Sequence, residues 1–139
     1  MKLQELAVSI ATKAHSGQVD KAGSPYIKHP LLVASAFSDE PHIVVALLHD
    51  VVEDTDITLA QLTSYGFPSD IIQAIDAITR RQGESYTEYL TRVRANSIAR
   101  EVKLADLRHN MDLSRISHPT QKDYTRLEKY KSAVALLKE

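Results

Sequence analysis

Hydrophobic residues recur at helical spacing along almost the whole chain. The first such stripe, with the i, i+3, i+4, i+7 spacing of one buried helix face, consists of Leu3, Leu6, Ala7, Ile10, Ala11 and Ala14. A loop rich in turn residues follows, and Pro30 predicts the first turn of a second helix that runs to about Phe37. The segment from His42 to about Glu53 is apolar nearly all round, which predicts a central, buried third helix.

The remaining chain predicts five further helices. Thr58 with Gln61 has the pattern of a capping box at the start of the fourth helix, and Ser85 with Glu88 has it at the start of the sixth. The other three are expected over about residues 71–78, 98–113 and 119–137. No segment alternates with period two for long enough to predict a strand. We therefore predict an all-α fold, a single-domain orthogonal bundle of about eight helices over residues 1–139.

The composition of the chain argues against several classes of function. The chain has 17 Lys+Arg against 18 Asp+Glu, a formal net charge of -1, and no basic tail, so we expect no nucleic-acid partner. It has no cysteine, which excludes disulfides, a thiolate zinc site and a cysteine nucleophile. The longest strictly apolar run, Ile43–Leu48, is far too short for a membrane span, and Met1–Glu5 lacks the apolar core of a signal peptide. These features predict a cytoplasmic protein without a membrane partner.

The end of the third predicted helix carries a polar cluster. His49, Asp50, Glu53 and Asp54 lie within about one turn of one another and are expected to converge on one side. Three acidic groups there oppose the negative end of the helix dipole, so we expect basic side chains or a metal ion to neutralise them. A solvated acidic helix end is the alternative. The apolar residues directly before the cluster and a second polar cluster elsewhere favour a binding site.

The second cluster lies on the seventh predicted helix, where Lys103 and Asp106 share a face with His109 and Asn110. A surface ion pair between Lys103 and Asp106 is the alternative to a site. A third feature is the Pro-bounded turn that delivers His29 to a helix start; a capping or core histidine is the alternative there. Without cysteine, any metal ion would be held by nitrogen and oxygen ligands.

Taken in order, these segments resemble the HD-domain metal-dependent phosphohydrolases. The motifs are His29-Pro30, the segment Leu47–Thr55 with its His49-Asp50 pair, and Val102–Met111 with Asp106. The resemblance is closer to the hydrolase domain of RelA/SpoT proteins and to the stand-alone small alarmone hydrolases, which the segments Ala14–Gln18 and Pro25–Ile27 also match.

The resemblance implies a reaction and a set of roles. It implies hydrolytic removal of the 3′-pyrophosphate from (p)ppGpp-type alarmones, with a small-molecule nucleotide as substrate and a homodimer as a possible assembly. The implied metal ligands are His29, His49, Asp50 and Asp106, with Mn²⁺ as the usual ion and Fe²⁺ or Zn²⁺ as alternatives. Glu53 and Asp54 would handle the attacking water, and His109 would support the site. The resemblance implies that Asn110 contacts the substrate. Independently of it, we expect Lys21, Lys103 and Arg108 to offset the repulsion between the acidic residues and a polyphosphate, and Tyr130 is a candidate for the pocket rim.

Three departures from the family pattern bear on the substrate: Asp20, Ala22 and the segment Asp112-Leu113-Ser114. Where long RelA/SpoT proteins have an arginine that lies against guanine, this chain has Asp20. Two alternatives therefore stay open: a hydrolase of another nucleotide or phosphorylated metabolite, and a nucleotide-binding scaffold without turnover. The presence of both Glu53 and Asp54 counts against the scaffold. Because the chain ends at Glu139, after the last predicted helix, we expect no synthetase activity.

Overall fold

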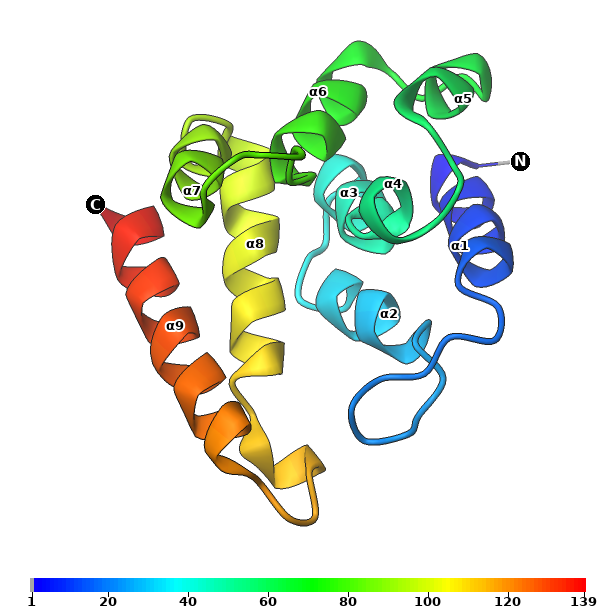
Figure 1. Ribbon diagram of the computed structural model, residues 1–139. Helices are drawn as coiled ribbons and strands as arrows, with labels where there is room; N and C mark the ends of the chain where they lie inside the picture. Colours follow the sequence, from blue (N-terminus) through cyan, green and yellow to red (C-terminus); the bar gives the residue numbers. More distant parts are fainter. Residues whose placement is uncertain (1) are drawn as a thin grey trace.

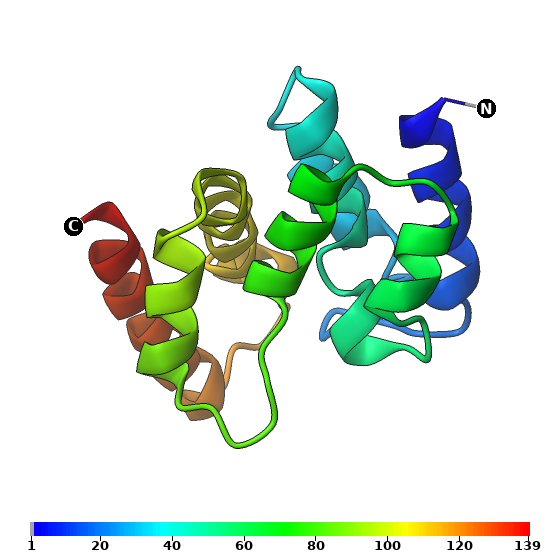
Figure 2. The ribbon, with the colours of Figure 1, turned by 90° about the horizontal axis from the view of Figure 1, so that it is seen from above.

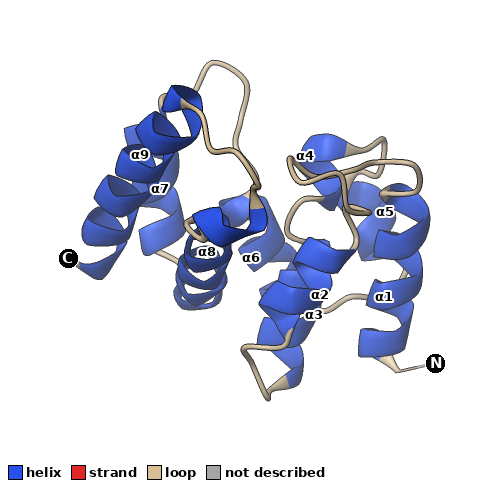
Figure 3. Ribbon diagram, turned by 90° about the horizontal axis from the view of Figure 1, so that it is seen from below, coloured by secondary structure: helices blue, strands red, loops and turns tan. Residues whose placement is uncertain are grey.

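The computed structural model describes residues 2–139, in which every regular element is a helix (Figures 1 and 3). The helices are α1 (Leu3–Ala14), α2 (Lys28–Ala34), α3 (Glu40–Leu48), α4 (Val51–Asp54), α5 (Leu59–Ser64), α6 (Ser69–Ile78), α7 (Tyr86–Arg94), α8 (Ser97–Asn110), the 3₁₀ turn η1 (Leu113–Arg115) and α9 (Gln121–Lys138). An isolated β-bridge joins Val19 to Pro25 in the loop between α1 and α2. The all-α prediction is confirmed.

The core is organised around α3 and α8. Every residue of α3 from Val44 to Leu48 is buried, and the helix packs against α1, α2, α6 and α8. Helix α8 in turn contacts α2, α6, α7 and α9, so it joins the first half of the chain to the second. In Figure 2 the two termini lie on opposite sides of the molecule, with α3, α6 and α8 between them. Residues on α3 and α8 are therefore held by packing from several directions.

The predicted helix from His42 to Glu53 is interrupted, and the expectation of one continuous helix was wrong. Helix α3 ends at Leu48, and α4 begins at Val51. The imidazole of His49 donates from Nδ1 to the carbonyl oxygen of Ala46, 2.5 Å away. In a continuing helix that carbonyl would bind the N–H of Asp50. The side chain thus satisfies a carbonyl at the helix end, and the chain turns between His49 and Asp50.

Helix starts follow the expected capping chemistry with one addition. Thr58 and Gln61 form the predicted capping box of α5, and the Ser85 hydroxyl accepts from the Glu88 N–H at the start of α7. Helix α9 begins after Thr120, whose side chain forms a capping box with Asp123 that we did not predict. None of the described helices combines the length and the apolar character needed to cross a membrane.

Candidate metal centre and adjoining pocket

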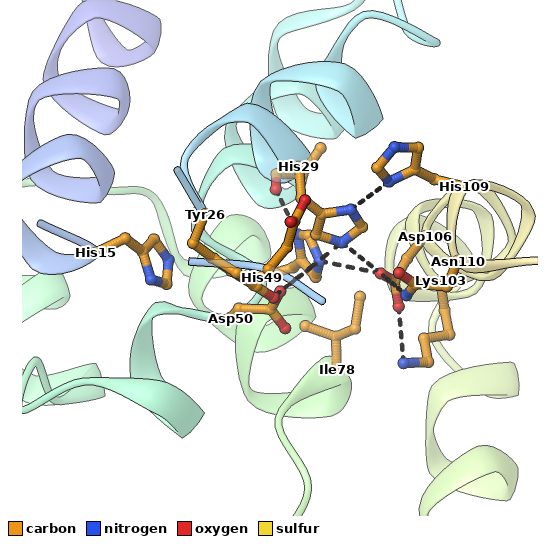
Figure 4. A network of polar contacts seen from close by, with 12 residues as sticks. His15, Tyr26, His29, His49, Asp50, Ile78, Lys103, Asp106, His109 and Asn110 are labelled. Carbon is orange, nitrogen blue, oxygen red and sulfur yellow. Dashed lines mark hydrogen bonds and ion pairs between the residues drawn. The ribbon is translucent and has the colours of Figure 1, made fainter. Parts of the chain in front are cut away.

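Four side chains from separate parts of the chain meet at one point (Figure 4). His29 comes from α2, His49 and Asp50 from the α3–α4 junction, and Asp106 from α8. Nε2 of His29 lies 2.7 Å from Oδ1 of Asp106 and 3.9 Å from Oδ2 of Asp50. Nε2 of His49 lies 3.0 Å from the same Asp50 oxygen and 3.5 Å from the same Asp106 oxygen. The structure therefore brings together the four side chains proposed as metal ligands.

The chemistry of His49 fits a bound cation. Because its Nδ1–H donates to the Ala46 carbonyl, Nε2 carries the lone pair when the ring is neutral. That nitrogen is buried, has no hydrogen-bond partner among the described residues, and faces two carboxylates. Burial acts to lower the pKa of His49, but Asp50 and Asp106 outweigh it and raise the pKa well above its ordinary value. The site thus favours a positive charge between these groups, either a proton or a metal ion.

The imidazole of His29 is oriented by the imidazole of His109. Nδ1 of His29 lies 2.6 Å from Nδ1 of His109, and the two rings are stacked with centroids 4.8 Å apart. Burial and the neighbouring His29 and Arg115 lower the pKa of His109, which favours its neutral, accepting form. With an ion in the site, His29 would donate from Nδ1 to His109 and use Nε2, which lies 2.7 Å from Oδ1 of Asp106, as a ligand atom. His109 contacts the site in the supporting manner we expected.

Both carboxylates are held by further donors. Asp106 accepts from Nζ of Lys103 at 2.9 Å and from Nδ2 of Asn110 at 3.0 Å. Asp50 accepts from the Tyr26 hydroxyl at 2.5 Å. Burial would raise the pKa of Asp50, but His49 and Tyr26 bring it down to about 2. Tyr26 was not among the predicted site residues, although it lies within the Pro25–Ile27 motif.

Glu53 and Asp54 lie one turn beyond the cluster, on α4. Glu53 is exposed, and its Oε1 accepts from the backbone N–H of Arg80 at 2.8 Å. Partial burial and the negative charges of Asp50 and Glu53 raise the pKa of Asp54 to about 6. The backbone carbonyl of Asp54 accepts from the Gln18 side chain at 3.2 Å. Asp54 therefore carries a carboxyl group that changes its charge close to neutral pH.

A pocket of about 330 Å³ adjoins the cluster and shares Tyr26, His29 and Asn110 with it. Its other walls combine cations, carboxylates and apolar groups: Val19, Asp20, Lys21, Leu113, Arg115, Ile116, Asp123, Arg126 and Tyr130. A volume of this size lies at the lower end of the range for small-molecule sites. The pocket therefore offers a concave, partly cationic space next to the candidate metal centre.

The predicted substrate contacts separate into two groups. Lys21, Asn110 and Tyr130 line the pocket, as expected. Lys103 instead forms an ion pair with Asp106. Both side chains are mostly buried, so this pair is not the surface ion pair that was the alternative to a site. Arg108 is exposed and lines a different hollow, between α8 and the residues that follow α2. The structure does not bring Arg108 to the pocket.

Two arginines of the pocket, Arg115 and Arg126, were not among the predicted site residues. Arg115 lies on η1 and Arg126 on α9, elements that reach the pocket only because the chain folds back after α8. Neither arginine belongs to a motif of the resemblance. The spacing of Arg126 and Tyr130, four positions apart on a predicted helix, was the one available signal.

Comparison with known proteins identifies relatives of this chain. Residues 7–116 match the HD domain family. The chain is 32% identical over 132 residues to a probable GTP pyrophosphokinase of Mycobacterium leprae, covering 86% of this chain and 17% of that protein. It is 33% identical over 117 residues to a guanosine-3′,5′-bis(diphosphate) 3′-pyrophosphohydrolase of Haemophilus influenzae, covering 73% of this chain and 17% of that protein. The chain thus spans about one sixth of the length of these curated relatives.

A solved structure shares the fold. It is described as a metazoan ortholog of SpoT that hydrolyses ppGpp, and it superposes with a TM-score of 0.80 at 24% identity, over 99% of this chain and 86% of that one. The match to the HD domain family covers residues 7–116, which include His29, His49, Asp50 and Asp106. The chain therefore belongs to the HD domain family, which implies divalent-metal binding, and the His–Asp cluster provides ligand atoms that could hold such an ion.

Proposed function

We propose that this protein is a metal-dependent phosphohydrolase that removes the 3′-pyrophosphate from (p)ppGpp-type alarmones. The observation that carries the proposal is the continuity of the His–Asp cluster with a cationic pocket through Tyr26, His29 and Asn110. The names of the pyrophosphohydrolase relatives and of the structural neighbour support this substrate class. We also propose that residues 1–139 form one HD-type hydrolase domain, because α9 packs on both α7 and α8.

In this proposal His29, His49, Asp50 and Asp106 hold the metal ion. Two imidazoles and two carboxylates suit Mn²⁺, with Fe²⁺ or Zn²⁺ as alternatives. When bound, the ion supplies a water of lowered pKa and polarises a phosphoryl oxygen. The Nδ1 contacts, of His49 with Ala46 and of His29 with His109, allow both histidines to present Nε2 to an ion, which would replace the proton that Nε2 of His29 shares with Asp106 at 2.7 Å.

Glu53 and Asp54 handle the attacking water. Glu53 has one oxygen fixed by the Arg80 N–H, which leaves the other free to orient a water molecule. Asp54, with a pKa raised to about 6, is ionised at neutral pH yet is a better proton acceptor than an ordinary carboxylate. Lys21 and Arg126, across the pocket, offset the charge of the substrate's phosphates.

A second candidate function is hydrolysis of a different nucleotide or phosphorylated metabolite at the same site. Asp20 favours this alternative because it places a carboxylate in the pocket wall, where it repels phosphate groups. A nucleotide-binding scaffold without turnover is the third reading, and the pKa of Asp54 near 6 argues against it.

The test is product release by the purified protein with Mn²⁺. Release of pyrophosphate from ppGpp, but not from GTP or simple phosphomonoesters, supports the proposal. Release from the other substrates supports the second candidate, and no release supports the scaffold. We expect His49→Ala to lose both metal and turnover, and Glu53→Ala to lose turnover while retaining metal. A fully active Glu53→Ala variant contradicts the role given to that residue.

Several expectations stay predictions. They are the cytoplasmic location, the homodimer and the identity of the ion as Mn²⁺.

A further inference from the structure

Arg115 forms an ion pair with a loop residue that is far from it in the sequence. Its Nη1 lies 3.3 Å from Oδ2 of Asp20, across 95 positions of the chain. Asp20 is itself fixed, because its Oδ1 accepts from the N–H of Ala22 at 2.9 Å and from the N–H of Ser24 at 3.0 Å. The guanidinium of η1 is thus held against the loop between α1 and α2 by a carboxylate that cannot move freely.

The rest of this guanidinium is available to a ligand. Arg115 lines the main pocket and also a second, smaller hollow beside His109. Its Nε is buried and has no hydrogen-bond partner among residues 2–139. A buried donor without a partner is unfavourable. A guanidinium has five N–H groups, and the hydrogen bond to Asp20 is made from Nη1. Since the Arg115 side chain is 30% exposed while its Nε is buried, a molecule in the pocket can accept from the terminal N–H groups that Asp20 leaves free.

The surroundings of Arg115 indicate which part of a nucleotide lies there. Val19, Leu113 and Ile116 provide apolar surface in the same pocket, which suits a flat base. The two other cations, Lys21 and Arg126, belong to the same pocket. Burial and the positive charges of Arg126 and Arg115 act together to lower the pKa of Lys21, so these cations lie close enough to favour a bound anion.

We propose that Arg115 is a specificity-determining residue that binds the nucleobase of the substrate, with Asp20 as its positioning residue; this inference rests on the proposed function. Arginine binds guanine by donating two hydrogen bonds to O6 and N7. Adenine has an amino donor in place of O6, so it offers only one acceptor on that edge. A bidentate contact of this kind corresponds to about 10- to 100-fold discrimination between the two bases.

The experiment compares the binding of GDP and ADP to the full-length protein loaded with Mn²⁺, by titration calorimetry. Both nucleotides carry the same diphosphate and neither has a 3′-pyrophosphate, so the ratio of their dissociation constants reports the base contact. The variants are Arg115→Ala, Arg115→Lys and Asp20→Asn. Arg94→Ala is the matched control, because Arg94 has a similar exposure, 34% against 30%, and a similar ion pair, with Glu139 at 3.0 Å.

We expect the wild-type protein and Arg94→Ala to prefer GDP by at least about 10-fold. Arg115→Ala should lose that preference while still binding both nucleotides through the other cations. Arg115→Lys can keep the ion pair with Asp20 but not the two-pronged contact, so it should recover thermal stability without recovering the preference. Asp20→Asn should reduce the preference, because the guanidinium is no longer held.

The outcomes distinguish this inference from the proposed function. If ppGpp is hydrolysed but Arg115→Ala keeps the preference for GDP, or Arg115→Lys restores it, the role of Arg115 is overturned and the function stands. If ppGpp is not hydrolysed but the preference depends on Arg115, the function fails and the inference stands. A wild-type protein that binds GDP and ADP equally, or binds neither, overturns the inference.

Discussion

His29 and His109 face each other with their Nδ1 atoms 2.6 Å apart, although they come from different helices. One of these nitrogens must donate and the other accept. Since His29 Nε2 points to Asp50 and Asp106, the arrangement that leaves this nitrogen free as a ligand has His29 donating to His109. The metal affinity of the site should therefore depend on a residue that is not itself a ligand.

We expect His109→Ala to weaken metal binding by about 10- to 100-fold, because His29 loses the acceptor that fixes its tautomer and ring orientation. The measurement is titration of the metal-free protein with Mn²⁺. His118→Ala is the control, since His118 is exposed on the segment between η1 and α9. An unchanged dissociation constant in His109→Ala would show that His29 needs no such partner.

Tyr26→Phe tests the donor to Asp50. Burial and the negative charge of Asp50 raise the pKa of Tyr26, so its hydroxyl stays protonated and donates. Loss of one hydrogen bond to a charged group costs about 1.5–3 kcal/mol, so we expect kcat/KM for ppGpp to fall by about 10- to 100-fold. Tyr124→Phe, at a tyrosine that is 49% exposed, should leave the rate unchanged. Wild-type activity in Tyr26→Phe contradicts the importance of this contact.

The carboxyl group of Asp54 should titrate near pH 6 in the metal-free protein, well above the ordinary value of 3.8. The negative charges of Asp50 and Glu53 contribute to that rise, so a divalent cation at the cluster should lower the value. Because the folded-state pKa is raised, the stabilising contribution of Asp54 is complete below about pH 4 and is lost as the pH rises through 6.

Carbon-13 NMR of the Asp54 carboxyl, with and without diamagnetic Zn²⁺, measures this pKa. Glu53→Gln removes one of the negative neighbours and should lower the pKa in the metal-free protein. A pKa near 4 without metal, or no change when Zn²⁺ is added, would contradict the electrostatic account of this group.

Gln18 should matter for turnover and not for metal binding. Its side chain joins Nδ1 of His15, at 2.9 Å, to the backbone carbonyl of Asp54, at 3.2 Å, and so connects the end of α1 to α4. Each neutral hydrogen bond contributes about 1 kcal/mol, so we expect Gln18→Ala to lower kcat by up to about 10-fold with the Mn²⁺ dissociation constant unchanged. Gln73→Ala is the control, because Gln73 is exposed and bonds only to Ser69. A loss of metal affinity in Gln18→Ala would show that α4 also holds the ligands in place.

Removal of the metal ion should destabilise the whole fold, since its proposed ligands come from three separate segments. At a free Mn²⁺ concentration 100 times its dissociation constant, binding adds about 2.7 kcal/mol to the free energy of unfolding. In a chain of this size that corresponds to a fall in Tm of about 10 °C on addition of a chelator. His49→Ala should show no such difference; a chelator effect that persists in this variant would place the ion elsewhere.

The sequence predicted the helices well, because each has a local signal. The stripe of α1 and the capping boxes of α5 and α7 depend on residues three or four positions apart, and such spacings are visible in the chain itself. The break between α3 and α4 had no such signal. It depends on the imidazole of His49 turning back to the Ala46 carbonyl, and neither glycine nor proline marks the place.

The site likewise contains residues that a sequence motif identifies and residues that no motif identifies. His29, His49, Asp50 and Asp106 lie in motifs that the family resemblance identifies, and their convergence is what α2, α3 and α8 produce when they pack together. Arg115 and Arg126 reach the pocket through the return of the chain after α8, and Tyr26 reaches Asp50 across 24 positions. Contacts of this range follow from tertiary packing, which the pattern along one chain does not encode.

The position of α8 between the two halves of the molecule has one more consequence. Asp106 is the one cluster residue of the four that comes from the second half of the chain, and the pocket likewise joins the loop between α1 and α2 to η1 and α9. Under the proposed function, a bound cation and a bound nucleotide would therefore both contact the two halves of the chain. Binding of the cation or of the nucleotide fixes the two halves at the separation that the second ligand requires. Each ligand should therefore raise the affinity of the protein for the other by an equal factor.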